Sequence, residues 1–163
     1  MSAVISTCGM YRYRLEREVA LDGPAYAFIG INPSTADACV DDATVRKWIG
    51  FVTRWGGRRF IVGNVFAYRA TDVRALASAV DPVGPKNDGY LAEIFRDADI
   101  IVPCWGARSK LTPELLPRLD MICRLLSGAT KSVMTFGFTA SGDPKHPLML
   151  GYDTALQPWR QPK

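Results

Sequence analysis

The stretch AYAFIGINPS at residues 25–34 decides how the chain folds. Its first seven residues are almost all apolar, and they lie between two turn signals, Gly-Pro at 23–24 and Asn-Pro at 32–33. A short apolar run bounded in this way is typical of a strand that is buried on both faces, as in a parallel sheet. The stretch therefore predicts a central strand that ends in a polar loop.

Three more apolar runs have the same character and predict strands at Phe60–Val65, Ile100–Cys104 and Ser132–Phe136. Between the strands, apolar residues recur at the spacing of an amphipathic helix. We expect helices from Thr44 to the glycine pair at 56–57, from Asn87 onward, and from the Thr-Pro pair at 112–113 to Gly128.

Asp42 is placed to cap the first of these helices. Strands that alternate with helices indicate right-handed crossovers and a parallel sheet with helices on both faces. We therefore predict an α/β fold, a three-layer α/β/α sandwich around a central, mainly parallel four-stranded sheet. Residues 11–17 alternate aromatic or apolar with basic residues, which leaves a short edge strand and a first helix as open alternatives.

The length of 163 residues predicts a single domain, 1–163, whose last part, 155–163, is a loosely held tail. The composition of 48% hydrophobic and 22% charged residues is ordinary for a soluble globular protein. No apolar run reaches the roughly 20 residues that span a bilayer, and the N-terminus lacks a signal-peptide pattern. Four cysteines without a Cys-x-x-Cys pair and a single histidine make a poor metal site. We expect a cytoplasmic protein with reduced thiols, no cofactor, no metal and no membrane partner.

The formal net charge is only +4, but the basic residues are unevenly placed. Three arginines, Arg12, Arg14 and Arg17, lie among tyrosines. A second group flanks the run at 60–65 and consists of Arg46, Lys47, Arg54, Arg58 and Arg59. Such a surface would attract phosphate groups. The alternative is a solvated basic face that only aids solubility.

Four polar or small-residue motifs each follow one predicted strand: GINPS at 30–34, GNVF at 63–66, PCWG at 103–106 and the stretch 136–146. An open parallel sheet binds its ligand beyond the carboxyl ends of its strands. We therefore expect the four motifs to form one site, with four residues along one rim of the sheet: Asn32, Asn64, Trp105 and Phe138.

Several motifs carry a family resemblance: YRY at 11–13, NPSTAD at 32–37, DDATVR at 41–46, NVFAYRATD at 64–72, VGPKND at 83–88, WG at 105–106 and KHPL at 145–148. With them the chain resembles the bacterial and phage family of unknown function DUF1643 over residues 11–150. That resemblance implies no reaction.

A second resemblance does suggest a reaction. GINPS at 30–34 is similar to the first motif of the uracil-DNA glycosylase superfamily, whose mismatch-specific members carry Gly-Ile-Asn-Pro-Gly. The later superfamily motifs are an Asn after the second strand, a small-residue turn after the third and a His-Pro-Ser loop after the fourth. Asn64, the Trp-Gly pair at 105–106 and the His-Pro-Leu stretch at 146–148 stand in those places. Ser34 and Leu148 depart from the pattern, and the element at 41–46 has no counterpart.

The superfamily resemblance implies a uracil-DNA-glycosylase-like domain that recognises a nucleobase and excises a uracil-type or modified base from DNA, in repair or modification. In that hydrolase reaction Asn32 would position the water, Asn64 would read the base edge and His146 would donate to the developing oxyanion. DNA or a nucleotide is the implied partner. The iron–sulfur members use a close N-terminal cysteine pair, and the sequence has none. No cluster is therefore expected.

Other residues complete the predicted site. Aromatic rings near the strand ends could stack on a base, although most such rings belong to a core; the candidates are Phe66, Trp105 and Phe138. Contacts to phosphate or DNA are expected from Ser34, Thr35, Arg46 and Arg69.

The element at 41–46 has two interpretations. Asp42 caps the helix and pairs with Arg46 one turn along, or Asp41 or Asp42 enters the site as an acid or base while Arg46 contacts phosphate. The second interpretation also suits a protein that binds or processes a nucleotide or modified base without glycosylase activity. A third possibility is a non-catalytic interaction domain.

Overall fold

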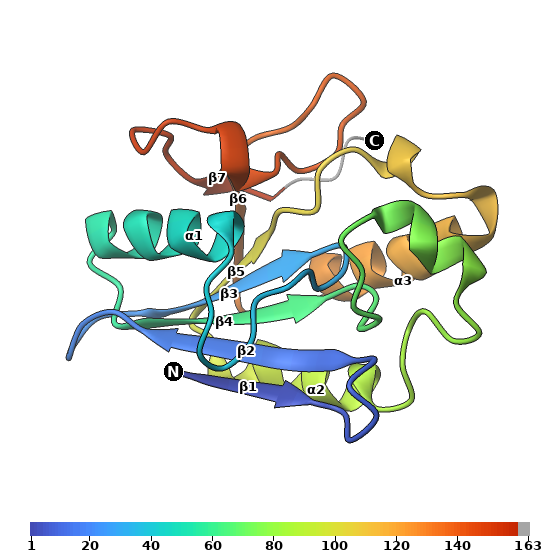
Figure 1. Cartoon of the computed structure of the whole chain (residues 1–163). Helices are drawn as coiled ribbons and strands as arrows, with labels where there is room; N and C mark the ends of the chain where they lie inside the picture. The colour runs from blue at the N-terminus through green and yellow to red at the C-terminus, as the bar shows by residue number, and fades with distance from the viewer. Residues whose placement is uncertain (160–163) are drawn as a thin grey trace.

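The computed structural model describes residues 1–159 and has an α/β fold built on one seven-stranded sheet (Figure 1). The strand order is β1-β2-β4-β3-β5-β6-β7. The strands are β1 Ser2–Ile5, β2 Arg12–Glu18, β3 Ala25–Gly30, β4 Arg59–Asn64, β5 Ile100–Pro103, β6 Ser132–Thr135 and β7 Gln157–Pro158. The strands from β4 to β6 pair in parallel, whereas β1–β2, β2–β4 and β6–β7 pair antiparallel.

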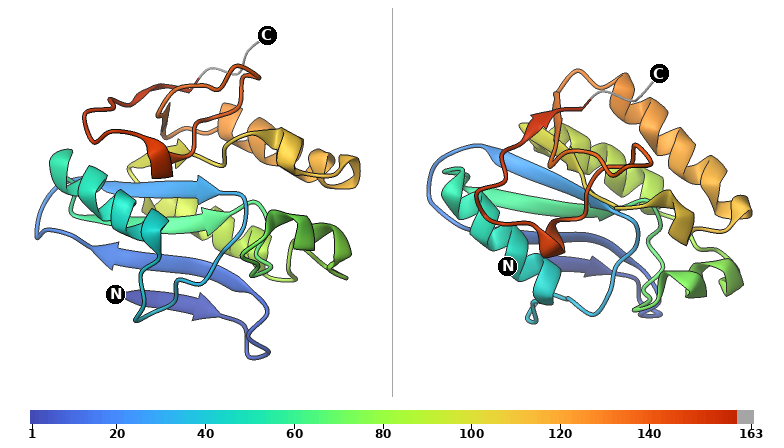
Figure 2. Two further views of the ribbon diagram at one scale, coloured as in Figure 1. Left: turned by 45° about the horizontal axis from the view of Figure 1, so that its top comes forward. Right: turned by 90° about the horizontal axis from the view of Figure 1, so that it is seen from above.

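Helices cover both faces of the sheet (Figure 2). They are α1 Ala43–Arg54, α2 Asn87–Asp97 and α3 Leu116–Ser127, with short 3-10 turns η1 Val73–Ser78, η2 Arg108–Lys110, η3 Pro113–Leu115 and η4 Pro147–Met149. One core cluster joins α1 to Phe28, and the other joins α2 and α3 to Ala27 and Ile29. Alternate residues of β3 therefore bury opposite faces, as its continuous apolar run predicts.

The four strands expected from the apolar runs are present, but the prediction of a four-stranded sheet is wrong because three more strands extend it. Residues 12–18 form β2, so the alternative of a first helix is wrong. This strand is not at an edge either, because it pairs with both β1 and β4. Single-sequence patterns do not show such pairings, because antiparallel neighbours are chosen by tertiary contacts.

Part of the expected tail, residues 157–159, is hydrogen-bonded to the sheet. Thr135 pairs with Gln157 in the β6–β7 ladder, and the backbone N–H of Trp159 donates to the carbonyl of Val133 at 2.9 Å. Residues 160–163 lie outside the described residues.

The predicted helix boundaries are confirmed at several ends. A carboxylate oxygen of Asp42 accepts a hydrogen bond from the backbone N–H of Val45 at 2.9 Å, which begins α1. At the third helix, Thr112 and Pro113 begin the turn η3 rather than α3 itself, and Gly128 is the C-cap of α3. Within residues 1–159, no helix is long and apolar enough to cross a membrane.

Candidate functional site

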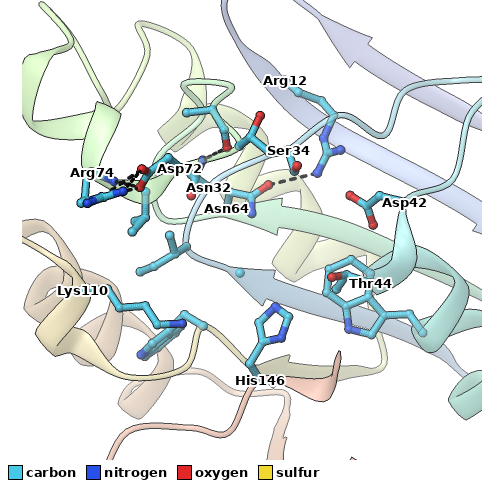
Figure 3. Close-up of a pocket in the computed structure, with 17 residues that line it drawn as sticks. Arg12, Asn32, Ser34, Asp42, Thr44, Asn64, Asp72, Arg74, Lys110 and His146 are labelled. Carbon is cyan, nitrogen blue, oxygen red and sulfur yellow. Dashed lines mark hydrogen bonds and ion pairs between the residues drawn. The ribbon is translucent and has the colours of Figure 1, made fainter. Parts of the chain in front are cut away.

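A pocket of about 540 Å³ lies beyond the carboxyl ends of β3, β4 and β5 (Figure 3). Parallel strands bring these ends to one edge of the sheet, so motifs far apart in sequence meet there. The lining residues are Arg12, Gly30, Ile31, Asn32, Ser34, Asp42, Thr44, Trp48, Asn64, Ala70, Thr71, Asp72, Val73, Arg74, Trp105, Lys110 and His146.

The pocket brings together six of the residues expected at the site: Asn32, Ser34, Asp42, Asn64, Trp105 and His146. Three of the four residues expected along one rim are among them. The fourth, Phe138, lies just after β6 and packs against Trp159 instead, with 5.7 Å between the ring centroids.

Asn32 is held in one orientation at the pocket wall. Its amide nitrogen Nδ2 donates to the carbonyl of Ala70 at 2.8 Å and to that of Pro33 at 3.1 Å. Because the nitrogen is occupied, the amide oxygen Oδ1 is left as the acceptor, and no residue in the described part of the chain donates to it. A fixed acceptor of this kind can orient a water molecule.

Asn64 ends β4 and is only 4% exposed. Its Oδ1 accepts from Nη2 of Arg12 at 3.5 Å, whereas its Nδ2 has no partner within residues 1–159. The buried side chain of Asn87 fixes the strand end by donating to the carbonyl of Asn64 at 3.1 Å. The Asn64 amide therefore presents a free donor on a rigid strand end, as recognition of a polar ligand edge requires.

His146 lies across the pocket from Asn64 (Figure 3). Its Nδ1 accepts from the backbone N–H of Leu148 at 3.3 Å, which leaves the proton of the neutral imidazole on Nε2. Burial lowers the pKa of His146, and the nearby charge of Lys110 lowers it further, against an opposing effect of Asp42. At neutral pH this side chain is therefore an uncharged donor through Nε2.

The two adjacent carboxylates have different surroundings. Asp42 lines the pocket, with one oxygen engaged in the helix cap. Asp41 instead accepts from Nε and Nη2 of the buried Arg17 at 2.8 and 2.7 Å. The expected ion pair between Asp42 and Arg46 is wrong, because Nη1 of Arg46 donates to the carbonyl of Asp41. Of these two carboxylates, Asp42 is the one that lines the pocket and can contact a ligand there.

Four other expected contacts lie outside the pocket. Phe66 is fully buried in the core cluster that includes α2 and α3, because its position after β4 turns it inward. Thr35 and Arg46 are exposed and do not line the pocket. Arg69 donates from Nη1 to the carbonyl of Gly9 at 3.3 Å.

The basic group among the tyrosines is not a solvated face. Arg12 and Arg17 are buried, and Arg14 pairs with Asp97 at 2.9 Å. These arginines belong to β2, and each of them contacts a polar group of the protein: Arg12 the carbonyl of Ala36, Arg14 the carboxylate of Asp97 and Arg17 that of Asp41.

Several pocket residues were not expected at the site: Arg12, Thr44, Trp48, Asp72, Arg74 and Lys110. Asp72 and Arg74 form an ion pair at 2.6 Å. Trp48 occupies a helical core position and stacks on Phe28 with 5.1 Å between the ring centroids, so the sequence pattern indicates only core. The signal that could have found Arg12 is its place in the YRY motif.

A comparison with protein families matches residues 12–148 to the family described as protein of unknown function (DUF1643). The chain belongs to the DUF1643 family. The matched segment of this DUF1643 protein begins at Arg12 and ends just after His146, so it contains every residue that lines the pocket. Neither the curated proteins nor the solved structures gave a match. Within residues 1–159, no group of three or more His, Cys, Asp or Glu side chains could hold a metal ion.

Proposed function

We propose that this DUF1643 protein recognises a nucleobase in DNA and excises it by hydrolysis of the N-glycosidic bond. The observation that supports this proposal is the convergence of Asn32, Asn64 and His146 on one pocket. These residues occur along the chain in the same order as the motifs of the uracil-DNA glycosylases. We therefore propose that the protein has a uracil-DNA-glycosylase-like fold and is distantly related to that superfamily. The pocket also falls within the usual range of ligand sites, about 300 to 1,000 Å³.

A base must leave the stack of a duplex to reach such a pocket. The nearly buried rings of Trp48 and Trp105 form part of its wall. The amide Nδ2 of Asn64 would donate to a carbonyl on the base edge. A base that lacks this acceptor would leave the amide unpaired, so this contact gives selectivity.

In the reaction, the bond between the base nitrogen and C1′ of the sugar breaks, and its electron pair leaves with the base. Negative charge then develops on a carbonyl oxygen of the base, where Nε2–H of His146 would donate a hydrogen bond. Oδ1 of Asn32 would orient the water that attacks C1′. An amide does not take up a proton, so the carboxylate of Asp42 would accept the proton of that water.

A second candidate function is binding or processing of a nucleotide or modified base without excision. The amide at position 32 favours it, because the residue best placed to orient water cannot act as a base. In this alternative the donor of Asn64 still recognises the ligand, and His146 contributes to affinity rather than to rate.

The experiment that tests excision uses single-stranded and double-stranded oligonucleotides that carry uracil, hypoxanthine or 5-hydroxymethyluracil. Each is incubated with the protein and then cleaved at abasic sites by alkali. We expect cleavage at one modified base with the wild type and with Lys145→Ala, whose side chain is exposed and outside the pocket, but not with His146→Ala. Tight binding of an oligonucleotide without any abasic site would favour the second candidate instead.

A further inference from the structure

Arg12 is a buried cation at the wall of the pocket. The residue is 4% exposed, and its Nη1 donates to the carbonyl of Ala36 at 2.7 Å. Its Nη2 reaches Oδ1 of Asn64 at the long distance of 3.5 Å, and its buried Nε has no hydrogen-bond partner within residues 1–159. Among the described residues, no carboxylate forms an ion pair with it.

The same strand provides a comparison. Arg17 is equally buried, but the carboxylate of Asp41 lies 2.7 Å from its Nη2. Burying a charge is costly unless an opposite charge compensates it. The fold thus places a carboxylate in ion-pair contact with Arg17, whereas Asp42 and Asp37 act on Arg12 only from beyond that distance, although both arginines occupy β2.

The charges around the pocket do not neutralise Arg12. Asp72 is engaged by Arg74 at 2.6 Å, which leaves Arg12 and Lys110 against the single carboxylate of Asp42. Burial lowers the pKa of Arg12 to about 10, so the guanidinium remains charged at neutral pH. The pocket therefore has an excess of positive charge close to the Asn64 amide (Figure 3).

We propose that the ligand of this pocket carries a negatively charged oxygen group and that Arg12 binds this group beside Asn64. The inference rests on the proposed function only in taking the ligand to be a nucleobase derivative. The planar guanidinium fork binds carboxylates and phosphates through paired hydrogen bonds. The group is a phosphate on the sugar of a nucleotide or a carboxylate on the base itself.

The experiment measures dissociation constants by calorimetry for two matched pairs of probes. Deoxyuridine and deoxyuridine monophosphate differ by a phosphate, and uracil and 5-carboxyuracil differ by a carboxylate on the base. We expect the charged member of one pair to bind the wild type at least about tenfold more tightly than its neutral partner, the scale of one charge-assisted hydrogen bond. The pair that shows the difference identifies the source of the charge.

The Arg12→Gln variant should lose this difference while keeping the affinity for the neutral probe. Arg12→Lys, which keeps the charge but not the fork, should retain part of it. Arg124→Gln is the matched control, because it removes an exposed cation outside the pocket. Should Arg12→Gln fail to fold, the affinities of the wild type and of Arg12→Lys for the charged and neutral probes still test the proposal.

Equal affinity of the wild type for both members of each pair, or no binding of any probe, would overturn the proposal. So would a charged-probe preference that Arg12→Gln retains. Excision is scored separately by the oligonucleotide assay. Charged-probe binding without excision contradicts the glycosylase function alone, and excision without a charge preference contradicts the Arg12 subsite alone.

Discussion

Gly30 and Asn64 are register partners at the ends of β3 and β4, and a Cβ on Gly30 would lie only 2.9 Å from Nδ2 of Asn64. Real Cβ atoms are not found at such a distance from another heavy atom. The glycine that opens the GINPS motif therefore leaves the space that the Asn64 amide occupies. This contact links the first motif of the site to the second.

Gly30→Ala should consequently displace the Asn64 amide and weaken ligand binding by about tenfold or more, the scale of losing one well-formed hydrogen bond. The variant is measured by calorimetry with the tightest probe, after circular dichroism has shown that it folds. Gly89→Ala is the control, because a Cβ there meets no described residue within 4 Å and Gly89 lies in α2. Unchanged affinity in Gly30→Ala would contradict the role of Asn64.

The two asparagines should differ in what they change. Asn32→Ala should slow base release while affinity stays close to that of the wild type, because a group that orients water acts mainly in the transition state. Asn64→Ala should weaken binding of the base itself. Single-turnover rates and dissociation constants, measured separately for each variant, check this. The same ratio of rate loss to affinity loss in both variants would contradict the assignment.

We expect Asp41 to stabilise the fold and Asp42 to act in the reaction. Asp41→Asn leaves the buried charge of Arg17 without a carboxylate, and we expect it to lower the free energy of unfolding by about 3 kcal/mol, measured with urea. Asp42→Asn keeps an N-cap of similar quality, so stability should change little. Its base release should nevertheless fall about a hundredfold through loss of the proton acceptor. The reverse pattern would assign the acid–base role to Asp41.

His146 should make the protein less stable in acid. Protonation of Nδ1 would turn the acceptor for the Leu148 N–H into a second donor, in addition to the cost of burying the charge. Both effects agree with a folded-state pKa below the ordinary 6.5. Below about pH 6.5 the unfolded chain then binds more protons than the folded one, so stability falls as pH decreases until the folded-state pKa is passed.

His146→Gln should remove this part of the pH dependence. The chain has one histidine, so no other imidazole contributes to it. The free energy of unfolding of the wild type and of the variant is measured with urea at pH 7 and pH 5. Titration of the carboxylates affects both proteins, so the difference between them reports on His146. Identical losses of unfolding free energy between the two pH values would show that the His146 pKa is not lowered.

The sequence predicts the parts of the fold that follow from local periodicity. The run at 25–31 identifies β3, and the cap at Asp42 identifies the beginning of α1, because burial on two faces and capping leave patterns within a few residues. Strands β1 and β7 have only four and two residues. β1 forms a hairpin with the next strand, β2, and β7 pairs with β6 across the loop 136–156. Nothing local distinguishes them from loops.

The residues of the candidate site divide in the same way, between those that local patterns place and those that only tertiary pairing places. Asn32, Asn64 and His146 meet because they lie near the ends of the elements that the pattern predicts. Arg12 reaches the pocket from β2, and only the antiparallel pairing with β4 places it beside Asn64. The interpretation of Phe66 as a base-stacking ring is not supported by its place in the core, since a residue just after a strand can turn inward or outward.

In the proposed reaction His146 donates a hydrogen bond to the base as it leaves. The decisive measurement is single-turnover release of the base from the best oligonucleotide substrate, with saturating wild type, Lys145→Ala and His146→Ala. We expect equal rates for the first two proteins and a rate at least about a hundredfold lower for His146→Ala, with unchanged affinity for the oligonucleotide. Wild-type turnover in His146→Ala, or no release of any base by the wild type, would contradict the proposed reaction.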